Sequence, residues 1–507
     1  MEQLRANERI LRHTGGTLSQ AFIEGEVALP VGKPEMAKVL MVRGRAQAGS
    51  VESLEARAMT DGTLTLSICY LDEEGTLCAF ESSSTFKHTA DVPGAQAGMR
   101  GYADAYVSSV EMSMTDGRRL NIAAVIDLVF YIQDEVDLAY CSADGAPEDL
   151  VTRGQDLELV RRVARATTAT EMDEEVVLTQ GLPAAAQVLL SDGFAKVQQA
   201  FAEQDTLCVE GELKLTLTYA CEDEQTPIAQ MFATVPFSDM LHAPGAQPGQ
   251  QVQVRATVKD LYVSPNEEGD ALHVQAVCAL EVEEEESFTR NALVDAYSLC
   301  HDVELEMEPL YTCCRCADAK GTTTQRETIS VGENPIPARV LAAFASPSAV
   351  KAVAMEDRVT LESVLTCQML YMDREGQLCN YTYEWPIRLE EEAAGFTTQT
   401  QVQATLHVEQ IQGVPAGAGM DLRVLLAWQV EGYREQTMSI VRQVECGEEM
   451  QTPQAGIVVY FAAEGDQLWD VAKRYKTSIA DIEKYNPDCA EHLEKGQKII
   501  LLCRKHG

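Results

Sequence analysis

The chain repeats itself three times, and this repetition constrains its fold more than any other feature. The motif Pro-x-x-Ala-x-Val-Leu occurs at residues 34–40, 183–189 and 335–341, at shifts of 149 and then 152 residues. A second marker keeps the same two shifts, a tyrosine that ends a strand-like run: Tyr70, Tyr219 and Tyr371. A unit of about 150 residues has the size of one domain. The sequence therefore predicts three related domains within the first 455 residues.

Each repeat is predicted to be mainly β. Residues 63–70 alternate between apolar and polar side chains, as a half-buried strand does. The acidic, glycine-ended turn at 72–75 joins them to residues 77–80 in a predicted hairpin. A second hairpin is expected around Asp116-Gly117, a dipeptide that favours tight hairpin turns. We expect a β-sandwich or an open barrel in each unit rather than a βαβ fold.

The remaining elements of the repeats follow from the same patterns. The expected strands of the second hairpins span residues 103–110 and 120–132, 252–262 and 272–282, and 402–410 and 422–430. Helices are expected at residues 1–11, 157–166 and 194–203. The segments 151–180 and 300–334 join the units and are candidates for edge strands. The predicted domain boundaries are 1–156, 157–308 and 309–446, followed by a linker at 447–455 and a small domain at 456–507.

The last domain has a compact strand–helix–helix–strand (βααβ) pattern. A β-rich run at 457–462 ends at Gly465, which permits a tight turn. A first helix follows, with apolar side chains at helical spacing: Leu468, Val471, Ala472 and Tyr475. Ser478 and Asp481 have the spacing of a capping box and open a second helix. Asn486-Pro487 ends this helix, and a final strand is predicted at 498–502.

Composition limits the class of protein and its partners. The 507 residues include 79 acidic and 40 basic side chains, for a formal net charge of −39. Such an acidic chain repels phosphate backbones, so nucleic-acid binding is not expected. Residues 456–507 hold eight acids and eight bases, so the repeats carry the whole excess. That excess either serves solubility or offers an acidic surface to a basic partner.

The N-terminus and the hydropathy of the chain predict where the protein resides. No run approaches the roughly 18 apolar residues of a membrane span, so membrane insertion is not expected. Residues 1–9 lack the apolar segment of a secretory signal. We therefore expect a cytoplasmic protein, in which most of the 15 cysteines are free thiols.

Motifs for catalysis are missing from the sequence. There is no His-Glu-x-x-His pair, no Gly-x-Ser-x-Gly elbow and no phosphate loop. We therefore expect no enzymatic activity and no cofactor. The acidic runs at 281–286 and 390–392 are predicted to be solvated strand edges, where charge discourages sheet-to-sheet aggregation.

The cysteines divide into core candidates and one dense cluster. Cys69, Cys208, Cys278 and Cys446 lie in apolar, strand-like runs and are predicted to pack in cores. The cluster consists of Cys313, Cys314 and Cys316, with His301 nearby. These are weak candidates for a zinc site, since zinc favours four Cys or His ligands but Cys-x-Cys without a second pair gives no clean chelate. Oxidisable thiols for cross-linking and incidental thiols are the other interpretations, and the last is favoured.

The order of these elements resembles a known family. The βααβ pattern resembles the LysM domain, which usually binds N-acetylglucosamine-containing glycans such as peptidoglycan. Three β repeats followed by LysM resemble the SipL-type spore coat morphogenesis proteins, whose body consists of SPOCS domains. The first repeat departs from the others, with Thr85-Phe86 where they have Pro236-Phe237 and Pro386-Ile387.

The resemblance implies binding residues in two loops of the terminal domain. Carried over to this chain, the glycan- or partner-binding residues are Gly465, Asp466, Gln467, Leu468, Asn486, Pro487 and Asp488. Gln467 stands where the family usually has Thr or Ser. This departure favours a protein partner over a glycan.

The resemblance also implies a function. It implies a non-enzymatic scaffold on the mother-cell side of the forespore surface. The acidic repeats would contact coat proteins, and the LysM domain would dock to the coat-basement ATPase or to an envelope glycan. The alternatives are a plain peptidoglycan-binding protein and a wall-targeted hydrolase with an unrecognised catalytic body.

Overall fold

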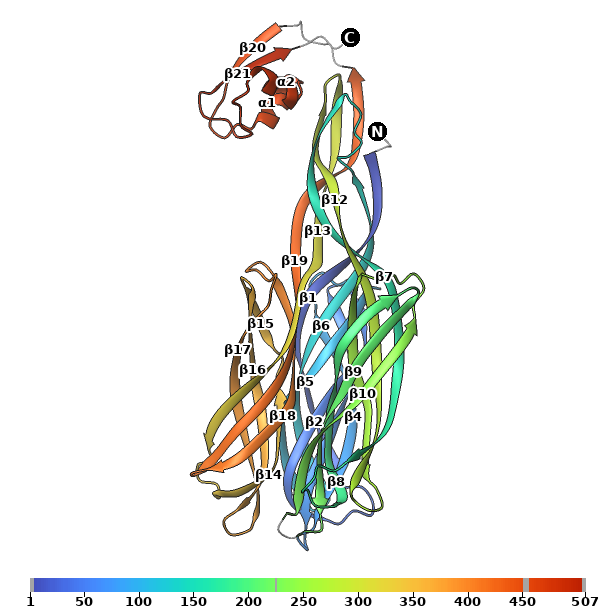
Figure 1. The fold of residues 1–507 in the computed structure, drawn as a ribbon, viewed down its shortest axis with the longest axis vertical. Helices are drawn as coiled ribbons and strands as arrows, with labels where there is room; N and C mark the ends of the chain where they lie inside the picture. The colour runs from blue at the N-terminus through green and yellow to red at the C-terminus, as the bar shows by residue number, and fades with distance from the viewer. Residues whose placement is uncertain (1–3, 224–225, 450–455, 504–507) are drawn as a thin grey trace.

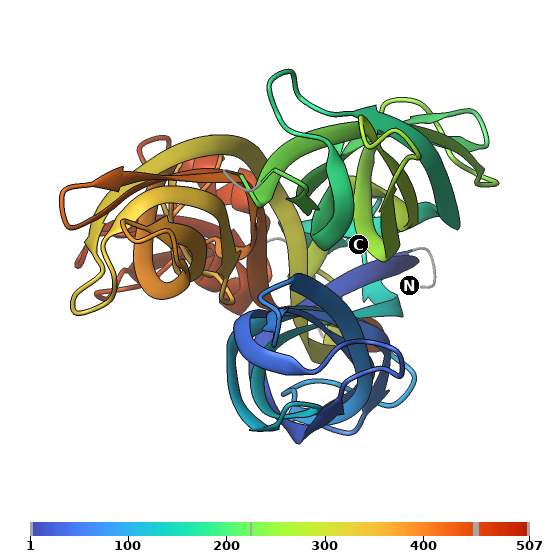
Figure 2. The ribbon, with the colours of Figure 1, turned by 90° about the horizontal axis from the view of Figure 1, so that it is seen from below.

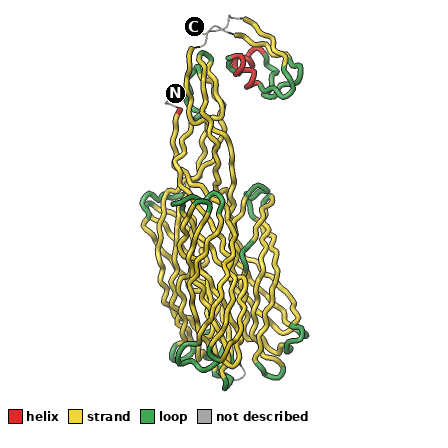
Figure 3. The backbone as a smooth tube through the Cα atoms, turned by 180° about the vertical axis from the view of Figure 1, so that it is seen from behind, coloured by secondary structure: helices red, strands yellow, loops and turns green. Residues whose placement is uncertain are grey.

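A computed structural model describes residues 4–223, 226–449 and 456–503. The chain forms a β body, a narrower stalk that rises from it, and a terminal module beside the tip of the stalk (Figure 1). Strands make up most of the described chain, and its α-helices belong to the terminal module (Figure 3). The mainly β class predicted from the sequence is therefore confirmed.

The first unit is one curved, six-stranded sheet. Its strand order is β1-β6-β5-β2-β3-β4. The bounds are β1 (Arg5–Ala28), β2 (Met36–Leu54), β3 (Arg57–Asp72), β4 (Leu77–Asp91), β5 (Arg100–Asp116) and β6 (Arg119–Cys141). This half-barrel contains the strands predicted at 63–70, 77–80, 103–110 and 120–132.

The second and third units follow the same path with the hydrogen-bonded sheet divided in two. The second unit has sheets β10-β9-β8 and β11-β12-β7. Its bounds are β7 (Leu150–Val177), β8 (Ala185–Glu203), β9 (Thr206–Cys221), β10 (Ile228–His242), β11 (Gln251–Pro265) and β12 (Ala271–Ser298). The third unit has sheets β13-β19-β18 and β14-β16-β15, with β17 paired to β16. Its bounds are β13 (His301–Ser330), β14 (Pro337–Pro347), β15 (Lys351–Met355), β16 (Arg358–Asp373), β17 (Leu378–Glu392), β18 (Gln401–Ala416) and β19 (Gly419–Glu449).

The expected sandwich or barrel is therefore only partly present, because backbone ladders between the described residues do not close the units. Side chains instead link β1 with β4, β7 with β10 and β13 with β17. Ser19 Oγ lies 2.7 Å from His88 Nε2 in the first unit. Thr170 Oγ1 donates to Asp239 Oδ2 at 2.9 Å in the second, and Thr323 bonds Glu391 in the third.

The two markers of the sequence repeat are joined to each other in every unit. The hydroxyl of Tyr70 donates to the carbonyl of Pro34 at 3.0 Å. Tyr219 makes the same bond to Pro183 at 3.2 Å, and Tyr371 makes it to Pro335 at 2.9 Å. Burial raises the pKa of each of these tyrosines to about 12, so each phenol stays a donor. The motif spacing thus encodes a tertiary hydrogen bond across 36 residues.

The three units are arranged around a common axis (Figure 2). The leucine that ends each Pro-x-x-Ala-x-Val-Leu motif lies on this axis, and Leu40, Leu189 and Leu341 are in one buried apolar cluster together with Phe344. We call this cluster the axial plug. Burying a leucine side chain stabilises by about 1.5–3 kcal/mol, so the motif also holds the units together.

The stalk is built from the first and last strands of each unit, which form a long antiparallel pair. β1 with β6, β7 with β12 and β13 with β19 pair in antiparallel register and continue beyond the body (Figure 1). One residue from the first strand of each unit meets inside the stalk: Leu11, Val160 and Cys314. Cys314 therefore takes the place that apolar side chains take in the other two units.

A layer of ionisable side chains separates the stalk core from the body. We call it the neck layer; it consists of His13, Arg162, Glu283, Glu285, Arg315 and Glu431. Arg162 lies 3.2 Å from Glu283, and Arg315 lies 3.4 Å from Glu431. His13 Nε2 lies 3.7 Å from Glu285 Oε1, and both side chains are almost fully buried.

Burial shifts two pKa values of the neck layer in opposite directions. It lowers the pKa of His13 to about 3, and Arg315 and Arg162 act in the same direction. It raises the pKa of Glu285 to about 7. Folding therefore keeps His13 neutral below pH 6.5, where the unfolded chain would protonate it, so stability is lost as the pH falls. Folding keeps Glu285 protonated above pH 4.5, so stability is lost as the pH rises toward 7.

The structure corrects several predictions. The helices expected at 157–166 and 194–203 lie inside strands β7 and β8, and residues 5–11 of the one expected at 1–11 lie inside β1. Long-range pairing overrides local helix propensity here, because each segment adds to a buried ladder. The run at 281–286 is not a solvated edge: β12 is a central strand, and Glu284 and Glu285 are buried.

Other predictions had mixed outcomes. The joining segments 151–180 and 300–334 do supply edge strands, β7 and β13. Cys69, Cys208 and Cys278 are buried as expected, whereas Cys446 is exposed near the end of β19. The boundaries at 156/157 and 308/309 fall inside β7 and β13 and stay predictions. Most of the predicted linker at 447–455 lies outside the described residues.

Candidate functional site

The terminal module folds as a βααβ unit. Strands β20 (Gly456–Phe461) and β21 (Lys498–Cys503) pair antiparallel and flank helices α1 (Leu468–Tyr475) and α2 (Ile479–Tyr485). The Ser478 side chain caps α2 by accepting a hydrogen bond from the Asp481 amide at 3.0 Å. The two helices and the sheet enclose a small core that includes Leu468, Ile482 and Leu501.

The first predicted binding loop is held by its own aspartate. Gly465 adopts φ +92°, a conformation that favours glycine. The Asp466 carboxylate accepts hydrogen bonds from Tyr460 Oη at 2.5 Å and from the Ala463 amide at 2.8 Å. These two bonds lower the pKa of Asp466, so it is a carboxylate at neutral pH. Asp466 thus shapes the loop, and both bonds engage the same oxygen, Oδ2.

The second predicted loop is held by an asparagine. The Asn486 side chain donates to the carbonyls of Ile482 and Ile500, at 2.7 and 2.8 Å, and accepts from the Ile500 amide at 2.8 Å. It therefore fastens the end of α2 to β21. Pro487 and Asp488 follow it and are exposed.

No hydrogen bond between described residues joins the two predicted loops to each other. In the described part of the module, the first loop pairs with residues 491–493: the Leu468 amide donates to the Glu491 carbonyl at 2.8 Å. Leu468 is buried in the module core, as its apolar spacing suggested. Of the seven predicted residues, Gly465, Pro487 and Asp488 are the exposed ones, and Gln467 is half-buried.

The side of the module near Gln467 rests against the tip of the stalk. Arg153 of β7 donates to Gln467 Oε1 at 3.2 Å and lies 3.6 Å from the Glu491 carboxylate. On β12, the Asp295 carboxylate accepts from Trp469 Nε1 at 2.7 Å and from Lys473 Nζ at 2.5 Å. These bonds therefore hold one side of the first predicted loop and the start of α1 against the stalk.

An aromatic contact completes this docking interface. The Tyr297 hydroxyl donates to the carbonyl of Thr477 at 2.8 Å. Its ring meets the Trp469 ring edge to face, with centroids 5.2 Å apart. Trp469 thus packs against the stalk as well as against its own module. Sequence patterns within the module gave no sign of Arg153, Asp295 or Tyr297, which lie more than 150 residues away in the chain.

The cysteine cluster does not assemble into a metal site. Cys313 and Cys314 are consecutive residues of β13, so their side chains point to opposite faces. Burial raises the pKa of both thiols to about 12, which disfavours the thiolate that zinc requires. Within residues 4–223, 226–449 and 456–503, no group of three His, Cys, Asp or Glu side chains is placed to hold a metal ion.

Part of the body matches the model of a known protein family. The family model described as SipL, SPOCS domain matches residues 35–115 and 185–266. These segments run from β2 to β5 and from β8 to β11, so the match falls on equivalent strands of the first two units. The first of them is the repeat expected to be divergent. No curated protein and no solved structure matches the chain. No helix in the described part of the chain is long and apolar enough to cross a membrane.

Proposed function

We propose that this protein is a non-enzymatic scaffold of spore envelope assembly. The SipL-type SPOCS match in two repeats supports a role in sporulation. In this proposal, the acidic body contacts coat proteins, and the LysM-like terminal module docks to a coat-basement protein, such as its ATPase. The protein would act in the mother-cell cytoplasm, at the forespore surface.

One observation favours a protein rather than a glycan as the ligand of the module. Ile457, Val459 and Phe461 alternate along β20 and are 71%, 43% and 65% exposed. Such an apolar stripe on a solvent-facing sheet is typical of a surface that another protein covers. Of the loop residues suited to acetamido and hydroxyl groups, Asn486 is engaged within the module, Gln467 is engaged by Arg153 of the stalk, and Asp466 is engaged through Oδ2.

A pull-down from sporulating cells tests this proposal. Full-length protein is compared with the variant Phe461→Ser, which removes the aromatic side chain at the end of the stripe, and with Asp488→Ala, which changes the exposed second loop. We expect Phe461→Ser to lose the coat-basement protein and Asp488→Ala to keep it. Retention on peptidoglycan that depends on Asp488, with no coat protein recovered, would favour the glycan-binding alternative. Hydrolysis of peptidoglycan by the purified protein would refute the scaffold.

A further inference from the structure

A cavity of about 800 Å³ lies on the axis of the body. All three units line it, and its wall includes Glu283 and Glu431 of the neck layer. Its volume lies within the range of small-molecule binding sites. The wall also includes Gln198 and Lys320, which are exposed, so the cavity communicates with solvent.

Small side chains on the strands that face the axis keep this space open. The lining residues with little or no side chain come from all three units: Gly44, Ala46, Ala105, Gly193, Ala195, Ala256 and Ala404. The axial plug closes the axis with the same residue, leucine, from every unit. At the cavity, in contrast, equivalent positions have diverged.

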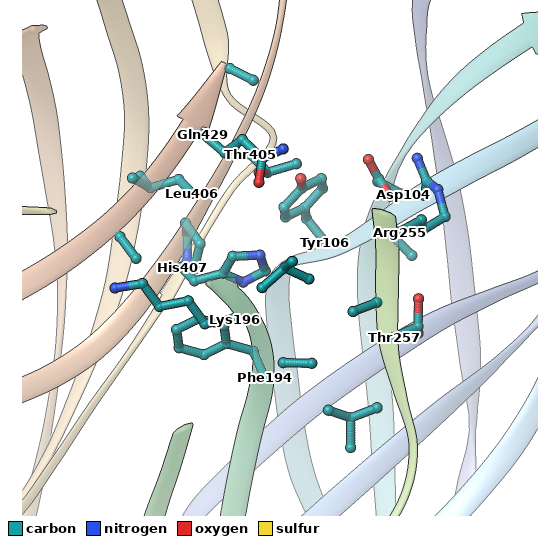
Figure 4. Close-up of a pocket in the computed structure, with 18 of the residues that line it drawn as sticks. Asp104, Tyr106, Phe194, Lys196, Arg255, Thr257, Thr405, Leu406, His407 and Gln429 are labelled. Atoms are coloured by element: carbon teal, nitrogen blue, oxygen red, sulfur yellow. Dashed lines mark hydrogen bonds and ion pairs between the residues drawn. The ribbon is translucent and has the colours of Figure 1, made fainter. Parts of the chain in front are cut away.

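The divergence gives each unit a different chemical group. At the shifts of 149 and 152 residues, Arg45 of the first unit corresponds to Phe194 of the second and Ser346 of the third, and all three line the cavity. Phe194 stacks on His407 with ring centroids 4.5 Å apart and the planes nearly parallel, at 6°. Figure 4 shows Phe194 and His407 together among the lining residues, which also include Tyr106. The cavity wall thus contains an aromatic pair and, from the first unit, a cationic side chain.

The charges of the cavity do not balance. Every lining carboxylate has a basic partner within 4 Å: Arg255 with Asp104, Arg43 with Asp192, Lys196 with Glu409, Arg100 with Glu283, Arg165 with Glu281 and Arg315 with Glu431. Among the described residues, Lys320 contacts only the backbone carbonyls of Val197 and Gln198. No acceptor in this part of the chain contacts the half-buried Arg45 guanidinium. Two cations of the cavity wall thus have no described carboxylate partner, in a protein of net charge −39.

We propose that the axial cavity binds a small organic anion that carries an aromatic ring. The guanidinium of Arg45 pairs with the carboxylate or phosphate of the ligand, since its planar fork matches such groups. The Phe194–His407 pair stacks on the ring. Lys320 at the rim adds to the local positive potential and attracts the anion. Because the three groups come from different units, the site exists only when all three repeats pack together.

Isothermal titration of the full-length protein tests the proposal with three probes of one shape. Naphthoate and naphthyl phosphate carry the proposed charge, and naphthylmethanol is the neutral control. We expect at least one anion to bind at one site per chain, and at least tenfold more tightly than the alcohol. Arg45→Gln should weaken that anion about ten- to a hundredfold, because a hydrogen bond to a charged group is lost. Arg45→Lys should retain part of the affinity.

A control variant at a second arginine distinguishes binding at a specific site from general electrostatic attraction. Arg423 of β19 is exposed and lies outside the cavity wall, so Arg423→Gln should leave binding unchanged. Phe194→Leu should weaken both the anions and the alcohol, since it removes the stacking surface. Equal affinity for all three probes, an equal effect of the two arginine variants, or no binding by either anion would overturn the proposal. Thermal unfolding of each variant shows whether the fold is intact.

Discussion

Replacing Asp295 with alanine should release the terminal module from the stalk. The bond from Trp469 Nε1 to the Asp295 carboxylate is partly buried, with Trp469 itself 5% exposed, and a hydrogen bond to a charged group contributes about 2 kcal/mol. The pair with Lys473 is partly exposed, with side-chain exposures of 41% and 27%, so we assign it about 0.5 kcal/mol. The loss of about 2.5 kcal/mol should raise the ratio of undocked to docked molecules about seventyfold.

Amide hydrogen exchange of the full-length protein measures this release. Peptides that cover residues 293–299 and 468–477 should exchange faster in Asp295→Ala, while peptides from the body should not change. Asp302→Ala is the matched control, because Asp302 is an exposed acid of the stalk in no described contact with the module. Unchanged exchange at both interface segments in Asp295→Ala would refute the reasoning, since the carboxylate would then not hold the module.

Three further predictions follow from packing, titration and thiol burial. Leu189→Ala should lower the free energy of unfolding by about 2–5 kcal/mol in chemical denaturation, because it opens a void in the axial plug; a loss below 1 kcal/mol would mean that the units do not depend on the plug. As the pH falls from 6.5 to 4.5, the free energy of unfolding of His13→Gln should rise by about 2–3 kcal/mol relative to that of the wild type, because only the wild type must keep a buried histidine neutral. Glu285 favours folding over this range in both proteins. Parallel pH profiles of the two proteins would contradict this. Iodoacetamide should modify the exposed Cys316 in the native protein and leave Cys314 intact until denaturant is added, as peptide mass spectrometry can show; rapid native labelling of Cys314 would argue against the stalk core.

The sequence predicted the strands better than the helices of the body. Alternation at 63–70 and the Asp116-Gly117 turn are local signals, and the structure contains strands β3, β5 and β6 where these signals place them. The segment 194–203 was wrongly predicted to be a helix because its short-range pattern resembles one. In the structure it belongs to β8 and pairs with β9, the next strand along the chain. Inside the terminal module, nearly every boundary is set by local residues such as Gly465 and Ser478, and all four of its elements lie where they were expected.

The sites show a similar division. The resemblance to LysM implied the two loops of the module, but it did not indicate that Asp466 Oδ2 and the Asn486 side chain form hydrogen bonds within the module. The same holds for the run at 281–286, which looked like a solvated edge. In the structure, Arg162 of β7 forms an ion pair with Glu283 of this run, and the charges of Arg315 and Arg162 act to lower the pKa of the buried Glu285.

By itself, the sequence determined the repeat, the β character of its units and the βααβ module, because periodicity, turn residues and caps act over a few neighbouring positions. It also marked the prolines and tyrosines that bond to each other in each unit. Only the tertiary structure decided what lies on the axis. The plug, the neck layer, the cavity and the docking of Trp469 on Asp295 each join residues more than a hundred positions apart. Such contacts follow from how the three units pack, and no local pattern along the chain records that packing.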